Sequence, residues 1–545
     1  MRLKGDLLIS QRIKTIIQNC QQEPLPEKHE IAFTANPEFG DYSSNIAFLL
    51  AKIQNRPAND IANELVSKLS KYEEFSLVSV AGKGFINFTL ADKVLLNELK
   101  AAMENNFGRI DIGKRKKVVV EYISANPTGP LNVVQARAGA FGNTLVNLLR
   151  FVNYDAISEY YINNTGTQVD LLYESFLARI NELKGIKTNI PDQGYPGAYL
   201  IDIAQEVLKN KLPEEKWRAY LLQAILSMQK RSLSNFNINF DNFAEESTFK
   251  TKQESVLKRL KDLTYTKDGA LWFKASAFKD TEDRVLITAN GRPTYFLSDL
   301  AYHWDKFDRG FEQLINIWGP DHHGYIARMK SGLSALGFNP DHLIIIIAQQ
   351  VSLLKNREKV VMSKRAGKYV TLDDVLTEIG SDALKFFLLM RRASQHLEFD
   401  LELAKKTSQE NPVYYVQYAH ARIKSIIRFA QGKNIGGLDE MQSIDGAKRH
   451  QPDLSILSNP QERALVKMIT RFPDAIVTSA NNLEPHHLIY YLLDLTTVFH
   501  KFYEGVRVVT DDIKTTAARI YLCQVTLRVL KDTLMIIGVS APEKM

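Results

Sequence analysis

Residues 118–148 read VVVEYISANPTGPLNVVQARAGAFGNTLVNL, and this stretch decides the fold class. Its first seven residues are mostly β-branched and apolar, which is typical of a parallel strand buried on both faces. A loop with two prolines and a glycine follows at 125–130. Apolar residues then recur at spacings of four and three, as one helix face requires: Val134, Ala138, Phe141, Leu145 and Leu148. The sequence therefore predicts a strand, a turn and a helix.

A second unit of the same kind follows further along the chain. Residues 314–318 are apolar and of strand length, and 319–324 read GPDHHG. The helix predicted after this turn has three inward residues, Ile326, Met329 and Leu333. Residues 343–348 add another buried strand. Alternating strands and helices predict a doubly wound parallel α/β sheet, whose ligands bind at the carboxyl ends of strands, so 125–135 is the first candidate site.

The sequence around this sheet divides into successive globular units, because no solenoid repeat is visible. The first unit, residues 1–108, contains an apolar helical pattern around 46–65 and ends in a strand-like alternation that begins at Phe85. The sheet domain is expected over 109–405, with a largely helical insertion at about 155–270. From about residue 411 the pattern is helical to the end, which predicts an all-α domain over 406–545; an exposed connection interrupts it at 431–457.

Composition narrows the class of protein only broadly. A length of 545 residues with 45% hydrophobic content allows several cores, and a net charge of +7 suits a polyanionic partner without requiring one. The two cysteines, Cys20 and Cys523, indicate neither a disulfide framework nor a zinc site. The amino terminus is too polar for a signal peptide, and the most apolar run, 343–348, is far below the roughly 18 residues needed to span a bilayer. We therefore expect no membrane association and a cytoplasmic location.

Several segments resemble one family of enzymes in the expected order. Residues 120–131, VEYISANPTGPL, and 160–166, YYINNTG, resemble the nucleotide-binding half of bacterial arginyl-tRNA synthetases. Further matches are 39–45 (FGDYSSN), 319–325 (GPDHHGY), 361–367 (VMSKRAG), 411–422 (NPVYYVQYAHAR) and 538–545 (GVSAPEKM). The resemblance covers essentially the whole chain.

The resemblance implies a class I aminoacyl-tRNA synthetase. Its parts would be an α+β amino-terminal domain that touches the elbow of tRNA, a Rossmann-like catalytic domain and a helical anticodon-binding domain. Arginine and ATP would form arginyl-adenylate, and the arginyl group would then pass to the terminal adenosine of tRNA(Arg). Magnesium is the expected companion of ATP. We expect a monomer.

The family's arginine pocket resembles five residues here: Glu121, Asn126, Tyr295, Asp299 and His323. The planar guanidinium of arginine is best bound by a carboxylate that accepts two parallel hydrogen bonds, which favours Glu121 and Asp299. A structural alternative exists for both, since Glu121 could lie on an edge strand and Asp299 could begin a helix. An acid within an apolar strand is costly unless paired, which favours a functional role for Glu121.

Two loops resemble the nucleotide-binding signatures of class I enzymes. In the second signature, Met362 and Lys364 are expected at the ATP, with Lys364 on the pyrophosphate and Ser363 donating to a phosphate oxygen. The family often has lysine where Val361 stands, and Lys359 could partly replace it. Without the resemblance, 359–368 would be a solvated basic loop.

The first signature departs from the family pattern of histidine, an apolar residue, glycine and histidine. This chain has Asn132, Val133, Val134 and Gln135 there, preceded by the expected ATP contacts Pro127 and Gly129. Asn132 and Gln135 still offer neutral N–H donors and are our candidates for the phosphate-binding role. The branched side chain of Val134 should occupy space that adenine needs.

Aromatic and basic residues near the carboxy terminus resemble anticodon contacts, in which rings stack on splayed bases and a guanidinium engages phosphate. They are Tyr415, Tyr418, Arg422, Phe499 and Met545, with Tyr414 beside them. Any single ring could instead be a core aromatic. In the first unit, Asn36 and Phe39 resemble contacts to the tRNA D-loop. His322 and His323 lack a third ligand at useful spacing, so no metal site is predicted.

The altered first signature leaves three readings open. The chain could be an active arginine ligase with a remodelled nucleotide loop, a duplicated synthetase that binds tRNA or arginine as a regulator, or an enzyme resistant to an inhibitor that mimics ATP. We favour the first and third, because a chain freed from catalysis has no physical need to keep the arginine pocket and Lys364 together. A more distant alternative is adenylation of another substrate, which would follow if Glu121 and Asp299 did not converge.

Overall fold

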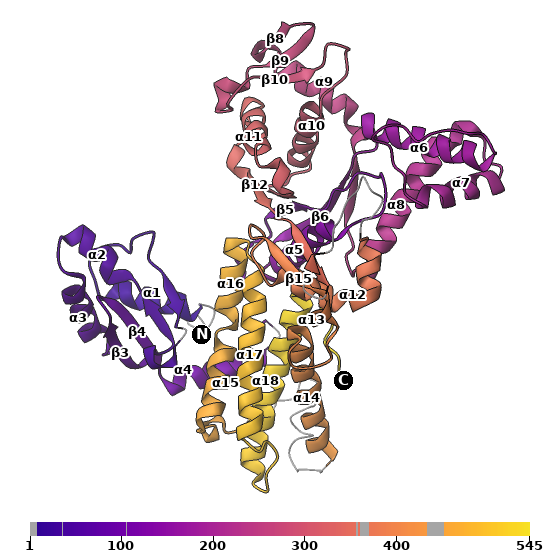
Figure 1. The fold of residues 1–545 in the computed structure, drawn as a ribbon. Helices are drawn as coiled ribbons and strands as arrows, with labels where there is room; N and C mark the ends of the chain where they lie inside the picture. The colour runs from indigo at the N-terminus through magenta and orange to yellow at the C-terminus, as the bar shows by residue number, and fades with distance from the viewer. Residues whose placement is uncertain (1–7, 35, 105, 356–357, 360–369, 433–451) are drawn as a thin grey trace.

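The computed structural model describes residues 8–34, 36–104, 106–355, 358–359, 370–432 and 452–545. Figure 1 shows an amino-terminal unit on one side, a central sheet with two projecting arms, and a column of long carboxy-terminal helices. Within the described ranges, no helix is both long enough and apolar enough to cross a bilayer. The predicted class is confirmed: a parallel-sheet domain stands between an α+β unit and a helical one.

The amino-terminal unit combines four helices with an antiparallel sheet of order β1-β2-β4-β3. Its elements are α1 (Ile9–Asn19), β1 (Ile31–Phe33), η1 (Pro37–Phe39), β2 (Tyr42–Ser44), α2 (Ile46–Gln54), α3 (Ala58–Leu69), β3 (Phe75–Ala81), β4 (Phe85–Leu90) and α4 (Asp92–Ala101). The predicted helical pattern at 46–65 is two helices, because Asn55 takes a left-handed backbone with φ of 50° and Pro57 follows. The strand predicted from Phe85 is confirmed as β4.

The central sheet has five parallel strands in the order β12-β11-β5-β6-β7. They are β5 (Lys117–Glu121), β6 (Asp155–Ile162), β7 (Asn242–Glu245), β11 (Gln313–Trp318) and β12 (Leu343–Ile347). Residues 118–120 are fully buried, as expected for the middle strand of a sheet covered on both faces. Glu121 is paired in register with Asn316 on one side and Glu159 on the other, so polar groups meet at the carboxyl end of the sheet.

The helical insertion begins later than the predicted residue 155. Residues 155–162 form β6 beside β5, and 242–245 form β7 at the edge of the same sheet. The strand was missed because DAISEYYI mixes acids and apolar residues; Glu159 is fully buried and paired, so it hides the expected alternation. Between these strands, three helices surround a small core of their own: α6 (Thr167–Leu183), α7 (Tyr199–Lys209) and α8 (Trp217–Asn235).

A second arm rises from the other part of the sheet (Figure 1). It contains η3 (Glu246–Phe249), α9 (Lys250–Arg259), the antiparallel strands β8 (Thr264–Lys267), β9 (Ala270–Phe273) and β10 (Arg284–Ile287), then α10 (Tyr295–Asp308) and α11 (Tyr325–Ala335). Met329 and Leu333 of α11 are buried as predicted, and Ile326 is half-buried. Helix α10 packs against α9 and α11, and it carries several of the polar residues described below.

Helix α5 (Val133–Phe151) runs from the candidate loop into the molecule and packs against α12 (Leu372–Leu389) and α18 (Ile513–Ile537). Three members of its predicted inward face are buried, namely Phe141, Leu145 and Leu148. Val134 and Ala138 are only half-buried, so the beginning of the helix is partly open.

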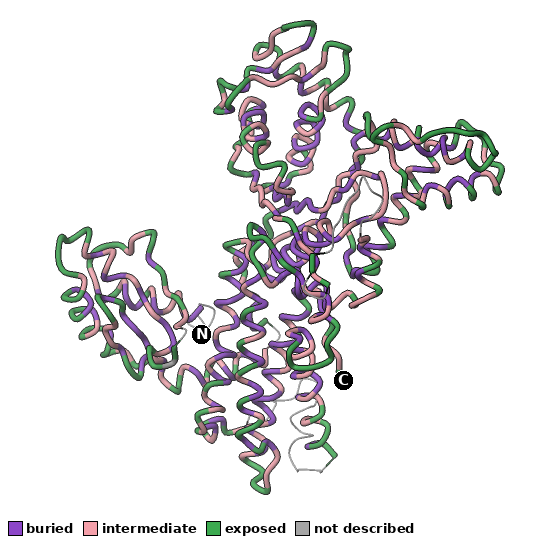
Figure 2. The backbone as a smooth tube through the Cα atoms, in the orientation of Figure 1, coloured by how far each residue is buried: buried purple, intermediate pink, exposed green. Residues whose placement is uncertain are grey.

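The carboxy-terminal helices form the column in Figure 1, and Figure 2 shows that α17 and α18 carry much of its buried surface. A small sheet of β13 (Val351–Lys355), β14 (Glu358–Lys359) and β15 (Leu397–Asp400) precedes them, with α13 (Leu401–Lys405). The column contains α14 (Pro412–Gly432), α15 (Pro460–Thr470), α16 (Phe472–Asn482), α17 (His486–Gly505) and α18. Buried Asp474 of α16 accepts hydrogen bonds from the hydroxyls of Ser10 and Tyr42, which joins the column to the amino-terminal unit.

Candidate functional site

Glu121 lies at the carboxyl end of β5 and is 7% exposed. Its Oε2 accepts a hydrogen bond of 2.6 Å from Nζ of Lys306, a fully buried residue of α10, and its Oε1 accepts one of 3.1 Å from the Ser124 hydroxyl. The predicted pairing of this acid is therefore found, but with a lysine of the chain itself. Position alone gave no signal for Lys306, which lies far away in the sequence.

Asp299 faces the same region from α10. Its Oδ2 accepts a hydrogen bond of 2.6 Å from the Tyr325 hydroxyl of α11. Burial raises the pKa of Asp299 to about 7, the Tyr325 hydrogen bond opposes that rise, and the negative charges of Glu121 and Glu246 add to it. The two predicted carboxylates thus lie close enough to repel each other, and Asp299 is not a surface residue that merely begins a helix.

Glu246 is a third acid of this cluster, and we did not predict it. It follows β7 directly, is 7% exposed, and accepts a hydrogen bond of 2.6 Å from the Asn163 amide in the orientation that its neighbours require. Burial raises its pKa, while hydrogen bonds from Ser298 and Thr165 lower it. All these partners are neutral. The signal in the sequence was an acidic residue immediately after a strand.

The Tyr161 hydroxyl of β6 is buried among these acids and has no hydrogen-bond partner within the described part of the chain. Its pKa is raised by burial and then by the charges of Asp299, Glu246 and Glu121. We call these three carboxylates, with Tyr161 and Lys306, the acidic pocket. The pocket holds three acids and one lysine, so a cationic ligand would balance its excess negative charge.

The other three predicted arginine contacts lie on the loop after β5, at the start of α10 and just before α11. Asn126 is half-buried and its amide donates to Gln168 Oε1 at 2.6 Å. Tyr295 is 52% exposed and stands one helical turn before Asp299 on α10. His323 is exposed and precedes Tyr325, the donor to Asp299, by two residues. Tyr295 and His323 are thus accessible to a ligand, whereas the Asn126 amide is engaged by Gln168.

The loop at 125–130 is fixed by side chains from distant elements. The buried Gln229 amide of α8 donates to the carbonyls of Asn126 at 3.1 Å and Gly129 at 2.8 Å. The Tyr199 hydroxyl of α7 donates to the Thr128 carbonyl at 2.6 Å, and the Tyr160 hydroxyl of β6 to the Ala125 carbonyl at 3.0 Å. The helical insertion therefore holds the loop. These anchors were missed because sequence distance hides them.

The turn that leads into this loop has a rare backbone conformation. Ile123 has a φ of 69° and Ser124 one of 41°, although neither residue is glycine. A β-branched residue in the left-handed region is strained, and such strain is held where the surroundings fix the chain. Here the Ser124 hydroxyl accepts from the Tyr161 amide at 3.2 Å and donates to Glu121, so the turn is tied to the acidic pocket.

Asn132 and Gln135 form a reciprocal cap at the start of α5. Asn132 Oδ1 accepts hydrogen bonds from the backbone amides of Val134 at 3.0 Å and Gln135 at 3.2 Å. In return, Gln135 Oε1 accepts one from the backbone amide of Asn132 at 2.8 Å. Such a capping box satisfies backbone donors that have no partner inside the helix. Both side-chain oxygens are therefore used, and within the described part of the chain neither side-chain nitrogen has a hydrogen bond.

Val134 and the segment at the start of α12 complete the environment of this helix start. Val134 is half-buried and packs against the main hydrophobic core. The segment before the helix is held by Leu131, whose carbonyl accepts from the Leu372 amide at 2.8 Å, and by a bridge between Asn132 and Thr371. The predicted residues Met362, Ser363 and Lys364 lie outside the described residues.

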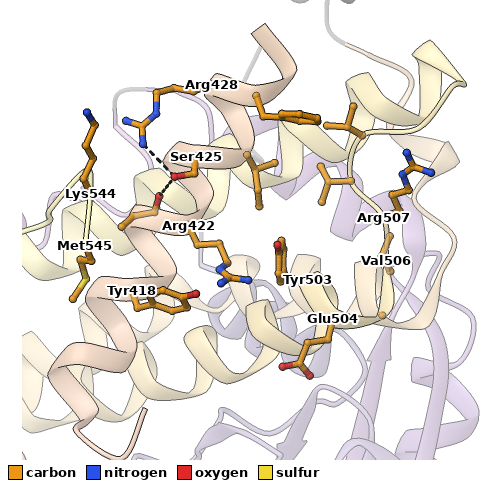
Figure 3. Close-up of a pocket in the computed structure, with 16 residues that line it drawn as sticks. Tyr418, Arg422, Ser425, Arg428, Tyr503, Glu504, Val506, Arg507, Lys544 and Met545 are labelled. Carbon is orange, nitrogen blue, oxygen red and sulfur yellow. Dashed lines mark hydrogen bonds between the residues drawn. The ribbon is translucent and has the colours of Figure 1, made fainter. Parts of the chain in front are cut away.

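A second candidate site is a cavity of about 1130 Å³ in the helical column, between α14, the end of α17 and the carboxy terminus. Figure 3 shows Arg422 between two rings, and its guanidinium lies 4.6 Å from the centre of Tyr418 and 4.5 Å from that of Tyr503. The predicted residues Tyr418, Arg422 and Met545 line this cavity. Its other charged lining residues are Arg428, Arg507, Lys544 and Glu504.

The lining has four cations and one acidic side chain, with the half-buried rings of Tyr418 and Tyr503 and the exposed ring of Phe429. This combination suits a segment of polyanion with unstacked bases. Two predicted contacts do not line the cavity. Phe499 is fully buried in the core, so a base cannot stack on its ring, and the alternative of a core aromatic is correct. Tyr415 packs beside His500, with ring centres 4.6 Å apart. Sequence spacing could not separate inward from outward rings on one helix.

The predicted D-loop contacts lie on the surface of the amino-terminal unit. Phe39 in η1 is 52% exposed, and Asn36 is exposed with its side-chain oxygen accepting from the Glu38 amide at 3.1 Å. Both side chains are accessible to a partner, so the predicted contact to the D-loop stays a prediction.

Comparison with known families assigns the three parts of the fold. Residues 7–90 match the model described as arginyl tRNA synthetase N terminal domain, 98–398 that of tRNA synthetases class I (R), catalytic domain, and 416–545 the DALR anticodon binding domain. The parallel sheet and its polar carboxyl end therefore belong to a class I aminoacyl-tRNA synthetase.

Individual relatives narrow the class. The chain is 41% identical over 545 residues to the arginine–tRNA ligase of Syntrophotalea carbinolica, covering 97% of each chain. It is 40% identical to that of Heliobacterium modesticaldum, covering 93% of this chain and 92% of the other. The solved arginyl-tRNA synthetase of Thermus thermophilus shares the fold, with a TM-score of 0.77, 22% identity, and coverage of 99% of this chain and 100% of that one. The chain belongs to the arginyl-tRNA synthetase family.

Proposed function

We propose that this protein joins arginine to tRNA(Arg) in two steps, with ATP consumed in the first. The observation that carries this proposal is the acidic pocket, in which three carboxylates lie at the carboxyl end of the parallel sheet and only Glu121 is paired with a lysine among the described residues. Ligands of such sheets bind at that end. Family membership supports the same reaction.

Arginine supplies the cation that the pocket lacks. A guanidinium forms its strongest contacts with carboxylates that accept parallel hydrogen bonds, and Asp299 and Glu246 have no cationic partner among the described residues. Lys306 offsets the charge of Glu121 and fixes its position, so Asp299 and Glu246 would be the main acids that attract the guanidinium. Asn126, Tyr295 and His323 would hold the backbone end of arginine and cover it.

ATP would lie against the loop held by Gln229, with Pro127 and Gly129 beneath it and its phosphates at the start of α5. The free amide nitrogens of Asn132 and Gln135 would donate to phosphate oxygens, as neutral N–H groups can. At an uncapped helix start, the backbone N–H groups can bind phosphate. Here the backbone amides of residues 134 and 135 already donate to Asn132, so the side-chain nitrogens would donate to the phosphates instead. Losing a preorganised donor typically costs about 3–4 kcal/mol in the transition state, so this arrangement predicts a slow enzyme.

Val134 would narrow the adenine site rather than close it, because part of its side chain packs inward on the core. Lys364 would stabilise charge on the leaving pyrophosphate, with Ser363 and Met362 beside it. The first turn of α5 carries no acid, so this part of the chain offers Mg²⁺ no ligand, and we assign no step to the ion.

The tRNA would contact both ends of the molecule. The cavity around Arg422 would take anticodon bases, with Tyr418 and Met545 in its wall and Tyr415 beside it, and the patch at Asn36 and Phe39 would meet the D-loop. Acylation would then occur at the central sheet. We expect a monomer in the cytoplasm.

A regulator that has lost activation is the second candidate, and the altered first signature favours it. An inhibitor-resistant enzyme is a third reading, since Val134 would also exclude an ATP mimic. We prefer an active ligase because the strained turn, the loop anchors and the acidic pocket are all intact.

Charging of tRNA(Arg) with labelled arginine tests the proposal. We expect arginyl-tRNA to form, slowly, and no product with lysine, whose ammonium lacks the planar fork. Tight tRNA binding without any charging would support the regulator instead.

A further inference from the structure

We propose that Glu484, His486 and His487 form a binding site for a transition-metal dication such as Zn²⁺. These residues lie at the corner between α16 and α17, where Leu483 takes a left-handed backbone that ends the first helix. One ligand atom from each of the three residues lies within 4.8 Å of the other two. The site is separate from the acidic pocket and from the cavity around Arg422.

The first two ligands are almost in place. Nε2 of His487 lies 2.9 Å from Oε2 of Glu484. In a tetrahedral zinc site with metal–ligand distances of about 2.0–2.1 Å, neighbouring ligand atoms are about 3.3 Å apart. The pair therefore needs to open only slightly to admit an ion. Both side chains are half-buried and can make this adjustment without moving the core.

The third ligand supplies an independent reason. His486 is 2% exposed, and its buried Nδ1 has no hydrogen-bond partner among the residues that the structure describes. Burying a ring nitrogen without a hydrogen-bond partner costs free energy. A metal ion bound to the imidazole would offset that cost.

The surroundings indicate which ions fit and what binding would do. Glu484 Oε1, the oxygen not facing His487, lies 3.5 Å from Nε of Arg392. Arg392 therefore competes with any cation for Glu484, so the two imidazoles must supply most of the affinity. Imidazole ligands favour Zn²⁺, Ni²⁺ and Cu²⁺ over Mg²⁺ and Ca²⁺, which rely on oxygen ligands. The Arg392 carbonyl accepts from Arg137 of α5 at 2.8 Å. The ion would thus stabilise the corner between α16 and α17, which contacts Arg392 and, through the Arg392 backbone, Arg137 of α5.

Thermal unfolding of the untagged full-length protein, stripped of metal by a chelator, tests this site. Zn²⁺ should raise the unfolding midpoint by a few degrees, because it binds only the folded chain, and Mg²⁺ should not. His487→Ala and Glu484→Gln should abolish the Zn²⁺ shift. His342→Ala, which removes an exposed histidine outside the cluster, should keep it. His486→Ala is not used because the residue is buried.

Visible absorption of bound Co²⁺ gives a second readout that does not depend on stability. The wild-type protein and His342→Ala should show the intense bands of a four-coordinate ion, and His487→Ala should not. The proposal is overturned if saturating Zn²⁺ leaves the wild-type midpoint unchanged, or if His487→Ala responds as the wild type does.

Discussion

At the scale of single residues, the three acids of the acidic pocket differ in the charge of the groups that hydrogen-bond to them. Glu121 has a buried lysine at 2.6 Å, whereas Asp299 and Glu246 accept hydrogen bonds only from neutral groups. Buried like charges without a counterion raise each other's pKa and favour a cationic ligand. The specificity of the site should therefore depend on Asp299 and Glu246 more than on charge in general.

Glu246→Gln tests the unpredicted acid. The change keeps the shape of the side chain and removes one negative charge, so we expect the KM for arginine to rise about tenfold, which corresponds to the roughly 1.4 kcal/mol of one charge-assisted contact. The KM for ATP should stay unchanged. Glu245→Gln is the matched control, since this neighbouring acid is exposed. Equal KM values for arginine in the two variants would contradict the role of Glu246.

The pH dependence should report Asp299. Its pKa is raised to about 7, and only the charged form pairs with a guanidinium, so kcat/KM for arginine should fall as the pH drops through about 7. The Tyr325 hydrogen bond lowers this pKa, so Tyr325→Phe should move the inflection to higher pH. Tyr220→Phe, in the insertion, should leave it in place. An inflection that does not move in Tyr325→Phe would exclude Asp299 as its source.

At the scale of elements, the start of α5 is closed by a helix cap at the positions where the resemblance implies two histidines. The side-chain oxygens of Asn132 and Gln135 are both committed to backbone amides, which a histidine pair could not do in the same way. This cap therefore stabilises the helix, and the side-chain nitrogens of Asn132 and Gln135 are what these two residues still offer a ligand as donors. Activity and stability should respond in opposite directions when the family pattern is restored.

The triple variant Asn132→His, Val134→Gly, Gln135→His tests this exchange. We expect arginine activation to rise at least tenfold, and the free energy of unfolding to fall by about 1–2 kcal/mol through loss of the cap and a glycine in the first turn. Pyrophosphate exchange and denaturant unfolding measure the two effects. Val134→Ala is the control, because it frees space and keeps the cap. A triple variant that gains stability would contradict the account of the helix start.

Sequence reasoning succeeded where a pattern is local. The strand at 118–121, the loop and α5 follow from neighbouring residues, and Glu121 was found because an acid interrupts an apolar strand. Lys306 and Gln229 could not be found this way, since 185 positions separate Lys306 from Glu121 and 103 separate Gln229 from Asn126. Glu246 was missed because its partners, such as Asn163, lie on other elements. Phe499 was misplaced because helical spacing does not tell which face meets the core.

At the scale of the whole molecule, the acidic pocket and the cavity around Arg422 lie in different parts of the chain, on the sheet and on the helical column (Figure 1). One ligand that reaches from the sheet to this basic cavity must be long, and it must be anionic at the cavity, as tRNA is. Interactions such as those of Asp474 with Ser10 and Tyr42 hold the amino-terminal unit to the column, so all the candidate tRNA contacts belong to one connected body.

Arg422→Ala tests the cavity. Loss of the cation between two rings should weaken tRNA(Arg) binding about tenfold and reduce the dependence of binding on salt by about one phosphate contact. Filter binding at several salt concentrations measures both. Lys501→Ala removes an exposed cation of α17 outside the cavity and should keep the affinity within about twofold. Equal losses in both variants would mean that only overall charge matters.

The central claim is that this chain still activates arginine despite Asn132, Val134 and Gln135. Arginine-dependent exchange of pyrophosphate into ATP, measured with and without tRNA(Arg), tests it most directly. The account predicts slow exchange that requires arginine and is strongest with tRNA present. No exchange in either condition, from a folded protein that binds tRNA(Arg) tightly, would contradict it.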